Sequence, residues 1–313
     1  MEKKILVATD GSLNSERAVS YVARLFAGDP ELRVTLLNIL PPLPPILTDR
    51  EYGGEWQITS AKAAKLIKMQ KEKAKVFMDK GVDILIRKGQ ISAEATAATV
   101  HEKKVGLARD IIHEAGRGDY DAVVIGRRGL SRMQSAIMGS ISTKIVQGVQ
   151  TRPVWVIDGD VSSGKILVAV DASDTSLMAV DHLGFIINGL PNMKILLYHV
   201  IPGLRFLSME ETEIELDGIE EIMTEKGAER IQPFFFQARK ILLDAGVSER
   251  QVSIKIKKCS TNIARDIVSE ATRRNFGTVV LARRGVSKSK EFFMGSVSNK
   301  VLSMANNLAC WIV

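Results

Sequence analysis

The sequence predicts an α/β protein made of two tandem, doubly wound domains, each with a five-stranded parallel sheet. The first observation behind this prediction is an alternation of short apolar runs with segments of helical periodicity. The second is an internal repeat: GRRGLSRMQSAIMGSISTK at 126–144 returns as ARRGVSKSKEFFMGSVSNK at 282–300. The third is the length of 313 residues, which suits two domains better than one.

The first copy alternates strand and helix patterns in order. Apolar runs of four to seven residues predict strands buried on both faces. Helical spacing follows the first run, and a prolyl loop and a long lysine-rich helix follow the second. The expected strands are 5–9, 34–40, 95–101, 122–125 and 154–157, and the expected helices lie around 18–26, 59–88, 107–115 and 140–147.

The repeat sets the domain boundaries. ILVATDGS at 5–12 matches ILVAVDAS at 166–173, and LARDII at 107–112 matches IARDIV at 263–268. The segment DGDVSSGK between the copies is polar and rich in glycine and serine, as linkers often are. We therefore expect domain 1 at 1–157, a linker at 158–165 and domain 2 at 166–313.

Composition excludes several classes of protein. Hydrophobic residues make up 45% of the chain and charged residues 25%, as in ordinary globular proteins. No apolar run reaches the roughly 18 residues that a membrane helix needs, and the two cysteines have no disulfide or zinc spacing. The N-terminus enters a strand pattern at once, which leaves no room for a signal peptide. We expect a cytoplasmic protein without a metal site.

The net charge of +7 belongs to residues 1–157, where 24 Lys and Arg stand against 17 Asp and Glu. Much of the excess lies in the lysine-rich helix, spaced as on a solvated face. A basic face can attract nucleic acid, but no nucleic-acid motif accompanies it, so nucleic acid is not an expected partner. The acidic run 210–221 in the second copy stands where the first copy has its lysines, and we interpret it as a solvated face as well.

The glycine-spaced loop of the first copy predicts an anion site. Gly126 and Gly129 follow the fourth strand, where glycine permits positive φ and the close approach of a phosphate. Gly139 and Ser140 open the next helix, whose free N–H groups and dipole favour negative charge. Asp10 ends the first strand across the same crevice and offers a carboxylate to ribose hydroxyls. The alternative is that these glycines serve only turns and that Gly-Ser only caps a helix.

These motifs together resemble the universal stress protein family. The pattern ILVATDGS, VVIGRRG, nine residues, GSIS and a closing PVWVI carries the resemblance, which covers nearly the whole chain as a tandem pair. The resemblance implies a Rossmann-like fold with strand order 3-2-1-4-5. It also implies that the chain binds ATP or a related adenine nucleotide, as some members do, together with magnesium.

The family's nucleotide-binding positions transfer residue by residue. The resemblance implies that Asp10 contacts ribose, that Ile39 packs on adenine through its backbone, and that the loop glycines and Ser140 hold the phosphates. The residues expected to bind nucleotide in domain 1 are Ala8, Thr9, Asp10, Ile39, Gly126, Arg127, Gly129, Gly139, Ser140 and Ile141. The corresponding possible second site comprises Asp171, Val200, Gly285, Gly295, Ser296 and Val297.

Two departures from the family pattern bear on this expectation. Arg127, with Arg128 beside it, stands where the family usually has a small polar residue. These arginines either embrace phosphate oxygens, or point to solvent, or block the loop. In the second copy Ala282 replaces the first loop glycine. Its methyl group narrows the space through which a phosphate approaches the backbone. In a backbone of positive φ it also costs roughly 1–2 kcal/mol. We therefore expect a weaker or empty second site.

The histidines, the aspartates of the repeated ARD motif and the tryptophans do not indicate a catalytic site. The four histidines share no motif spacing, and Asp110 and Asp266 are expected on exposed helix faces, so no catalytic residue is predicted. The closing strands are apolar and should lie at sheet edges, where pairing removes an exposed edge. By resemblance the two copies pair as an intramolecular pseudo-dimer through Val154–Ile157 and Cys310–Val313, and a homodimer is a further possibility. The alternative is that Trp155 and Trp311 are simply core residues.

Three hypotheses of function follow. The first is a stress-response regulatory protein that binds ATP, with at most slow hydrolysis, since no general base or Walker-type magnesium pattern is evident. The second is a nucleotide-free scaffold of the same fold, which Arg127 and Ala282 favour mildly. The third is an ATPase or phosphotransferase, which no motif supports.

Overall fold

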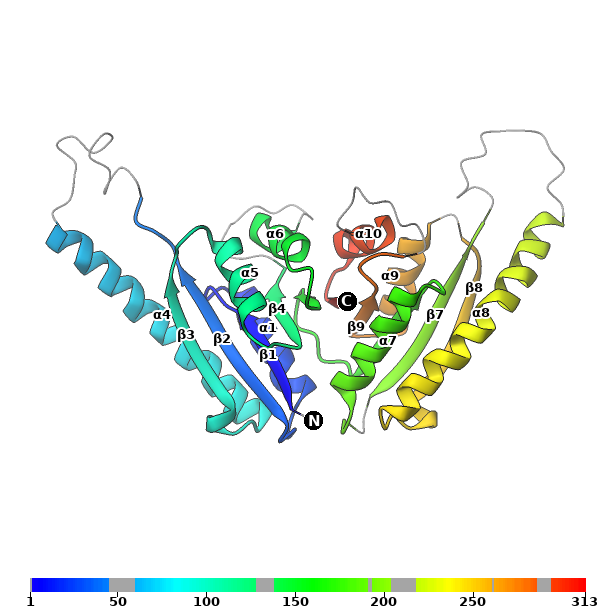
Figure 1. The fold of residues 1–313 in the computed structure, drawn as a ribbon, viewed down its shortest axis with the longest axis horizontal. Coiled ribbons are helices and arrows are strands. Elements are labelled where there is room, and N and C mark those ends of the chain that lie inside the picture. The colour runs from blue at the N-terminus through cyan, green and yellow to red at the C-terminus, as the bar shows by residue number, and fades with distance from the viewer. Residues whose placement is uncertain are drawn as a thin grey trace. The chain divides into compact units, whose positions relative to one another are not determined.

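The computed structural model describes residues 2–44, 60–127, 138–190, 193–203, 218–260, 262–285 and 294–313. These residues form two compact units. Unit 1 contains the described residues up to Arg152 except Met138, and unit 2 contains Met138 and the described residues from Pro153 to Val313. Each unit is described by itself (Figure 1).

Unit 1 alternates strands and helices as the apolar periodicity predicts. Its strands are β1 (Lys3–Ala8), β2 (Leu32–Leu40), β3 (Thr96–Glu102) and β4 (Ala122–Gly126). Its helices are α1 (Leu13–Leu25), α4 (Ser60–Gly89), the short 3-10 turn Ala93–Ala95, α5 (Leu107–Arg117) and α6 (Ser140–Gly148).

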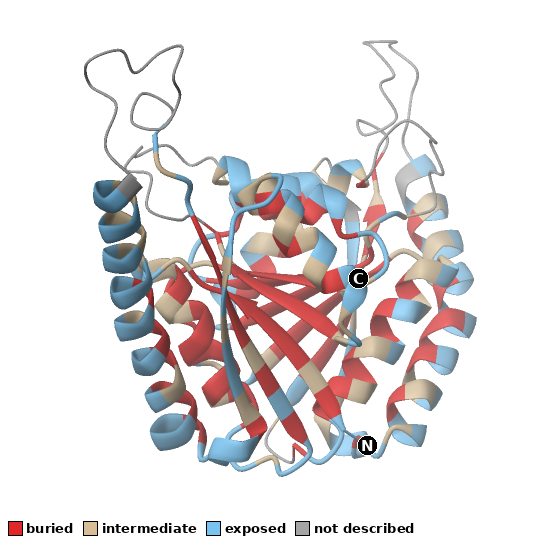
Figure 2. Cartoon of the chain, turned by 60° about the vertical axis from the view of Figure 1, so that its left-hand side comes forward, coloured by how far each residue is buried: buried red, intermediate tan, exposed pale blue. Residues whose placement is uncertain are grey.

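The strands of unit 1 pair in the order β3-β2-β1-β4, all parallel. β1 is central, with Val7 opposite Leu36 on one side and Val124 on the other, and its interior residues have no exposed surface. Helix α1 packs against α4, and α5 packs against α6. The outward sides of the helices are exposed while most of the strands are buried (Figure 2). Burial on both faces explains why these strands read as continuous apolar runs.

Local signals fix where α1 begins. Ser12 is its N-cap, and the Ser12 hydroxyl accepts a hydrogen bond from the Ser15 amide. Gly11, just before the cap, has a φ of +74°, and its Cα faces the Phe77 ring too closely for a Cβ. The tight turn that leaves β1 therefore needs glycine.

Unit 2 repeats this architecture. Its strands are β5 (Val154–Ile157), β6 (Lys165–Val170), β7 (Lys194–Pro202), β8 (Val252–Ser260), β9 (Thr278–Leu281) and β10 (Ala309–Ile312). Its helices are α7 (Asp174–Ile187), α8 (Ile219–Asp244), the 3-10 turn Glu249–Gln251, α9 (Ile263–Arg273) and α10 (Ser296–Met304). The order β8-β7-β6-β9-β10 is parallel throughout, which is the expected 3-2-1-4-5 order in the second copy.

Strand β5 belongs to unit 2, where it pairs antiparallel with β10. Trp155 lies opposite Trp311 in this pair, and their rings stack with centroids 3.9 Å apart. Both side chains are fully buried, and the Trp155 Nε1 donates a hydrogen bond to Nε2 of His182 on α7. The two tryptophans are thus buried where β5 and β10 meet.

The predicted fold class is confirmed. Most boundaries differ by a residue or two, but α1 begins at Leu13, five residues before the expected start at 18. β1 ends at Ala8 rather than Thr9, and β3 runs one residue further than expected, to Glu102. β3 is mostly exposed because it is the edge strand, which explains its weak sequence pattern. The predicted domain and linker boundaries remain a prediction.

Candidate functional site

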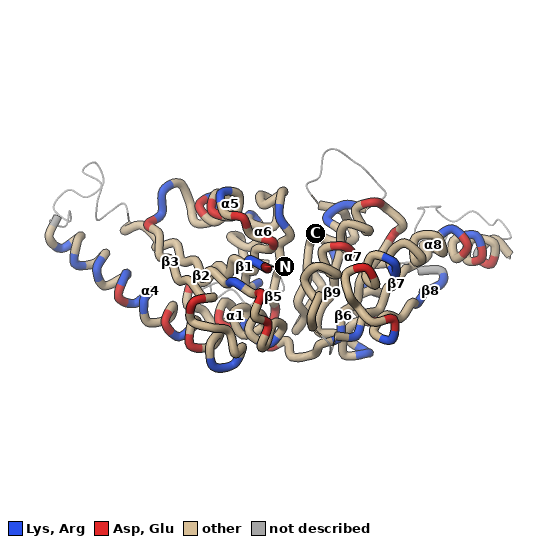
Figure 3. Tube along the Cα trace, turned by 60° about the horizontal axis from the view of Figure 1, so that its bottom comes forward, with Lys and Arg blue, Asp and Glu red and all other residues tan. Residues whose placement is uncertain are grey.

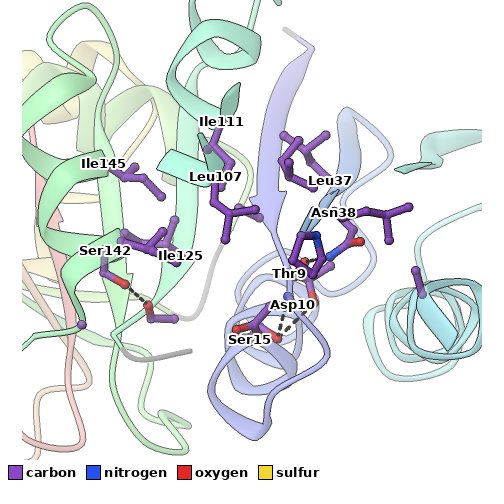
Figure 4. A pocket seen from close by; sticks show the side chains of 18 of the residues that line it. Thr9, Asp10, Ser15, Leu37, Asn38, Leu107, Ile111, Ile125, Ser142 and Ile145 are labelled. Atoms are coloured by element: carbon purple, nitrogen blue, oxygen red, sulfur yellow. Dashed lines mark hydrogen bonds between the residues drawn. The ribbon is translucent and has the colours of Figure 1, made fainter. Parts of the chain in front are cut away.

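A cavity of about 470 Å³ opens in unit 1 at the carboxyl ends of β1, β2 and β4. This is the edge where open α/β sheets bind ligands, beside the point where connections leave on opposite faces. Helix α4 forms one wall, and α5 and α6 form the other. The lining residues are Ala8, Thr9, Asp10, Ser15, Leu37, Asn38, Ile39, Leu40, Pro41, Gln70, Lys73, Ala74, Phe77, Leu107, Ile111, Ile125, Gly126, Gly139, Ser140, Ile141, Ser142 and Ile145 (Figure 4).

The cavity brings together eight of the ten residues expected to bind nucleotide in domain 1. They come from three segments far apart in the sequence: the end of β1, the end of β2, and β4 with the start of α6. Gly129 lies outside the described residues. Arg127 is 3% exposed, which excludes the alternative that it points to solvent, and it is not among the lining residues.

The end of β1 is held by short hydrogen bonds to α1. The Thr9 hydroxyl donates to Ser15 Oγ at 3.0 Å, and Asp10 Oδ1 accepts from the Ser12 amide at 3.0 Å. The Asp10 carboxylate is therefore oriented by the backbone and lines the cavity. An oriented carboxylate at this edge is suited to accept hydrogen bonds from hydroxyl groups.

Gly126 is required for a reason that the sequence does not show. Its φ is not among the positive values, so the conformational freedom of glycine is not what this position uses. A Cβ at Gly126 would instead lie 2.8 Å from the carbonyl carbon and oxygen of Asn14, in the first turn of α1. Close packing of β4 against α1 therefore excludes a side chain here.

Helix α6 directs its N-terminus at the cavity. Gly139 is its N-cap, and no side chain caps this end of the helix. The Gly139 amide donates a hydrogen bond of 3.1 Å to the carbonyl oxygen of Arg127. Ser140 and Ile141, in the first turn, are exposed. The first-turn N–H groups of a helix favour negative charge, so the start of α6 is suited to an anion at the edge of the cavity.

Sequence reasoning missed the wall that α4 forms. Gln70, Lys73, Ala74 and Phe77 lie three to four residues apart and so share one face of the helix. Lysines along α4, coloured blue in Figure 3, were interpreted as a solvated face and are exposed, but Lys73 also lines the cavity. Lys73 and Asp10 are the charged residues among the described lining residues. The spacing of residues 70, 73, 74 and 77 indicates that they share one face of the helix, but it does not indicate that this face lines the cavity.

The corresponding edge in unit 2 is arranged differently. Asp171 Oδ1 accepts hydrogen bonds from the hydroxyls of Ser173 and Ser176, at 2.5 and 2.6 Å. Gly285 packs so closely against Asp171 that a Cβ there would overlap Oδ2, and the Thr175 hydroxyl donates to Arg284 O at 2.6 Å. The first part of this glycine loop thus lies directly on the carboxylate.

The other second-site residues keep their expected places. Val200 is buried near the end of β7, and Gly295 is the N-cap of α10, which begins with Ser296 and Val297. Ala282 follows β9 without a positive φ, so the conformational penalty considered for its methyl group does not arise. Occupancy of this second site remains a prediction.

Asp110, which lies at the start of α5, has a structural task. Its carboxylate accepts hydrogen bonds from the amides of Lys104 and Val105, at 2.8 and 3.0 Å, and so closes the loop before the helix. Among the described residues, no group of three or more His, Cys, Asp and Glu side chains is arranged to hold a metal ion. No helix in that part of the chain is long and apolar enough to cross a membrane.

Fold and site define the class of the protein as a tandem pair of Rossmann-like α/β domains with a cavity at the carboxyl edge of the first sheet. The family model described as "Universal stress protein family" matches residues 1–158 and again 163–307. The chain therefore belongs to the universal stress protein family, as the loop spacing indicates.

Individual relatives agree with this assignment. A universal stress protein from Mycolicibacterium smegmatis is 25% identical over 188 residues, and the chain spans 58% of that relative's length. A shorter universal stress protein from Thermus aquaticus is 29% identical over 149 residues, which cover 47% of this chain and 92% of the relative.

Among solved structures, a universal stress protein from Archaeoglobus fulgidus is similar over 99% of this chain and 95% of its own. Its TM-score is 0.59 at 18% identity, a likeness of fold. A universal stress protein structure from Pseudomonas aeruginosa covers 100% of this chain and 93% of its own, with a TM-score of 0.54 at 17% identity.

Proposed function

We propose that the chain is a stress-response regulatory protein that binds ATP or a related adenine nucleotide in the cavity of unit 1. The observation that supports this most is the cavity itself, which gathers an oriented carboxylate, the start of a helix and apolar walls at one sheet edge. Apolar walls with a few convergent polar groups are typical of small-molecule sites.

In this proposal different residues bind different parts of the nucleotide. Asp10 accepts hydrogen bonds from the ribose, and the backbone of Ile39 contacts the adenine between apolar walls that include Leu107 and Ile111. The amides of Ser140 and Ile141 at the start of α6 hold phosphate oxygens. Gly129 keeps its predicted role at the phosphates, whereas Arg127 would reach them only by leaving its buried position. Magnesium would enter as the nucleotide's complex, bound through the phosphates.

We propose binding with at most slow hydrolysis. Asp10 is the carboxylate among the described lining residues, and the Ser12 amide already binds one of its oxygens. A carboxylate engaged in this way is poorly placed to activate a water molecule.

The first experiment is to denature the purified protein and to count released nucleotide per chain by mass spectrometry. One nucleotide per chain supports a working first site, and two per chain contradict the asymmetry between the units. The variant Asp10→Ala should lose nucleotide, and Asp171→Ala is its matched control in unit 2. If no nucleotide is released and calorimetry detects no binding of added ATP with magnesium, the nucleotide proposal is wrong and the scaffold hypothesis replaces it.

We also propose that the closing strands join the two copies as an intramolecular pseudo-dimer, through Val154–Ile157 and Cys310–Val313. The antiparallel register of β5 and β10 and the stacked tryptophans support this. Light scattering of the full chain would distinguish such a monomer from a homodimer. A cytoplasmic location and the absence of a nucleic-acid partner remain predictions.

A further inference from the structure

The side chain of Asn38 holds the ends of β1 and β2 together. Asn38 lies on β2, and its Nδ2 donates a hydrogen bond of 2.7 Å to the backbone carbonyl of Thr9, just beyond β1. A carbonyl oxygen only accepts hydrogen bonds, so this contact fixes which end of the amide is nitrogen and which is oxygen. Figure 4 shows this contact among the residues that line the cavity.

The other end of the same amide lacks a partner. Asn38 is 5% exposed, and its Oδ1 is buried with no hydrogen-bond partner among the described residues. A buried acceptor without a donor is destabilising, and native structures contain few of them. Asn38 forms part of the cavity wall, and because its Oδ1 has almost no accessible surface, a ligand in the cavity supplies that donor once the side chains that cover Oδ1 shift aside.

The second copy performs the same strand contact with another residue. His199 occupies the matching position on β7, and its Nδ1 lies 2.7 Å from the carbonyl of Val170, the counterpart of Thr9. Burial lowers the pKa of His199, which favours the neutral ring that donates through Nδ1. In an imidazole, the second atom bonded to Cγ is a C–H carbon. The position of Oδ1 in the first copy is therefore taken by a C–H group in the second.

We propose that Asn38 is a specificity-determining residue of the unit 1 cavity, whose Oδ1 accepts a hydrogen bond from a hydroxyl or amino group on the nucleoside part of the ligand. This inference rests on the proposed function. The side chain has two tasks at once: Nδ2 fixes the strand ends, and Oδ1 recognises the ligand. In unit 2, His199 keeps the contact between the strand ends but offers no acceptor at the position of Oδ1. Unit 2 therefore does not select for the same hydroxyl or amino group.

The test uses the full chain and isothermal titration calorimetry with four nucleotides. They are ATP, 2′-deoxy-ATP, 3′-deoxy-ATP and purine riboside triphosphate, which lacks the 6-amino group. The variant is Asn38→His, because the chain itself shows at position 199 that histidine maintains the strand contact. The control variant is His199→Asn, which should leave ATP affinity at the first site unchanged.

We expect one of the three analogues to bind the unaltered chain about tenfold more weakly than ATP, because it lacks the donor for Oδ1. The Asn38→His variant should bind ATP about tenfold more weakly than the unaltered chain does. It should bind that analogue no more weakly than it binds ATP. The analogue that loses affinity identifies the donor as a ribose hydroxyl or as the adenine amino group.

Two results would overturn the inference while leaving nucleotide binding intact. One is that all three analogues bind the unaltered chain as tightly as ATP, which decides the question even when Asn38→His does not fold. The other is that Asn38→His loses the same factor for ATP and every analogue, since that indicates a general distortion. If the unaltered chain does not bind ATP at all, the proposed function is wrong and this inference fails with it.

Discussion

Replacing Gly126 by alanine tests why the first loop begins with glycine. The added Cβ would lie 2.8 Å from the Asn14 carbonyl carbon and oxygen and 3.0 Å from the Ser15 amide nitrogen, all of them backbone atoms. Ordinary contacts begin near 3.4 Å, so β4 and α1 must separate by several tenths of an ångström. Overpacking of this kind costs about 1–3 kcal/mol. In a unit of about 150 residues this lowers the melting temperature by roughly 2–4 °C per kcal/mol.

The assay is calorimetric unfolding of nucleotide-free protein, with hydrogen exchange of peptides from β1 and β4 to locate the loss. Ala282→Gly is the matched control, because Ala282 holds the same loop position in unit 2 and already accommodates its methyl group. It should change stability by less than about 1 kcal/mol. If Gly126→Ala is as stable as the unaltered protein without ligand, and loses only ATP affinity, the glycine serves phosphate approach and our packing argument is refuted.

Three further predictions concern unit 2. Burial lowers the pKa of His182 to about 3 from its usual 6.5, so the unfolded chain binds the proton that the native chain excludes. Stability present above pH 6.5 should therefore fall by up to about 1.4 kcal/mol per pH unit between pH 6.5 and 3, and urea titrations should show a flatter profile for His182→Gln. Ala172 has a φ of +64° where unit 1 has Gly11, so Ala172→Gly should raise the free energy of unfolding by about 1 kcal/mol, and an unchanged urea midpoint would contradict this. Glu270 is 3% exposed and binds Lys255, Arg273 and Arg274 at 2.8–2.9 Å. Glu270→Gln should destabilise the unit by about 1–2 kcal/mol at pH 7, since the partly exposed cations can return to water. The loss should shrink as the pH falls from 4.5 through the lowered pKa of the native carboxylate.

Much of the fold could be predicted from sequence because parallel strands are buried on both faces. Ile5, Leu6 and Val7 have no exposed surface, and that burial is what an uninterrupted apolar run records. The cap at Ser12 is equally local, since its hydroxyl contacts an amide only three residues away. Features that depend on residues close together in the chain can therefore be predicted from the sequence.

The missed features depend on contacts between distant segments. The reason for Gly126 is the backbone of Asn14, 112 residues earlier in the chain. Lys73 has the same type and spacing as its solvated neighbours, and only the course of α4 past the sheet edge places it on the cavity. Likewise, nothing near Asn38 in the sequence indicates that its amide reaches the end of β1, because that contact spans 29 residues. Sequence reasoning predicted most of the residues at the strand ends that line the cavity, but not these details.

The two copies keep one framework and differ in the groups that would meet a ligand. The serine pair that caps the first helix is the same in both, with Ser12 and Ser15 in unit 1 matched by Ser173 and Ser176 in unit 2. In unit 2, however, both serines donate to Asp171, and the glycine loop lies against its other oxygen. A ligand there would have to displace these short hydrogen bonds before it could use the carboxylate. The asymmetry between the copies therefore follows more from this engaged carboxylate than from the methyl group of Ala282, which lies in ordinary backbone.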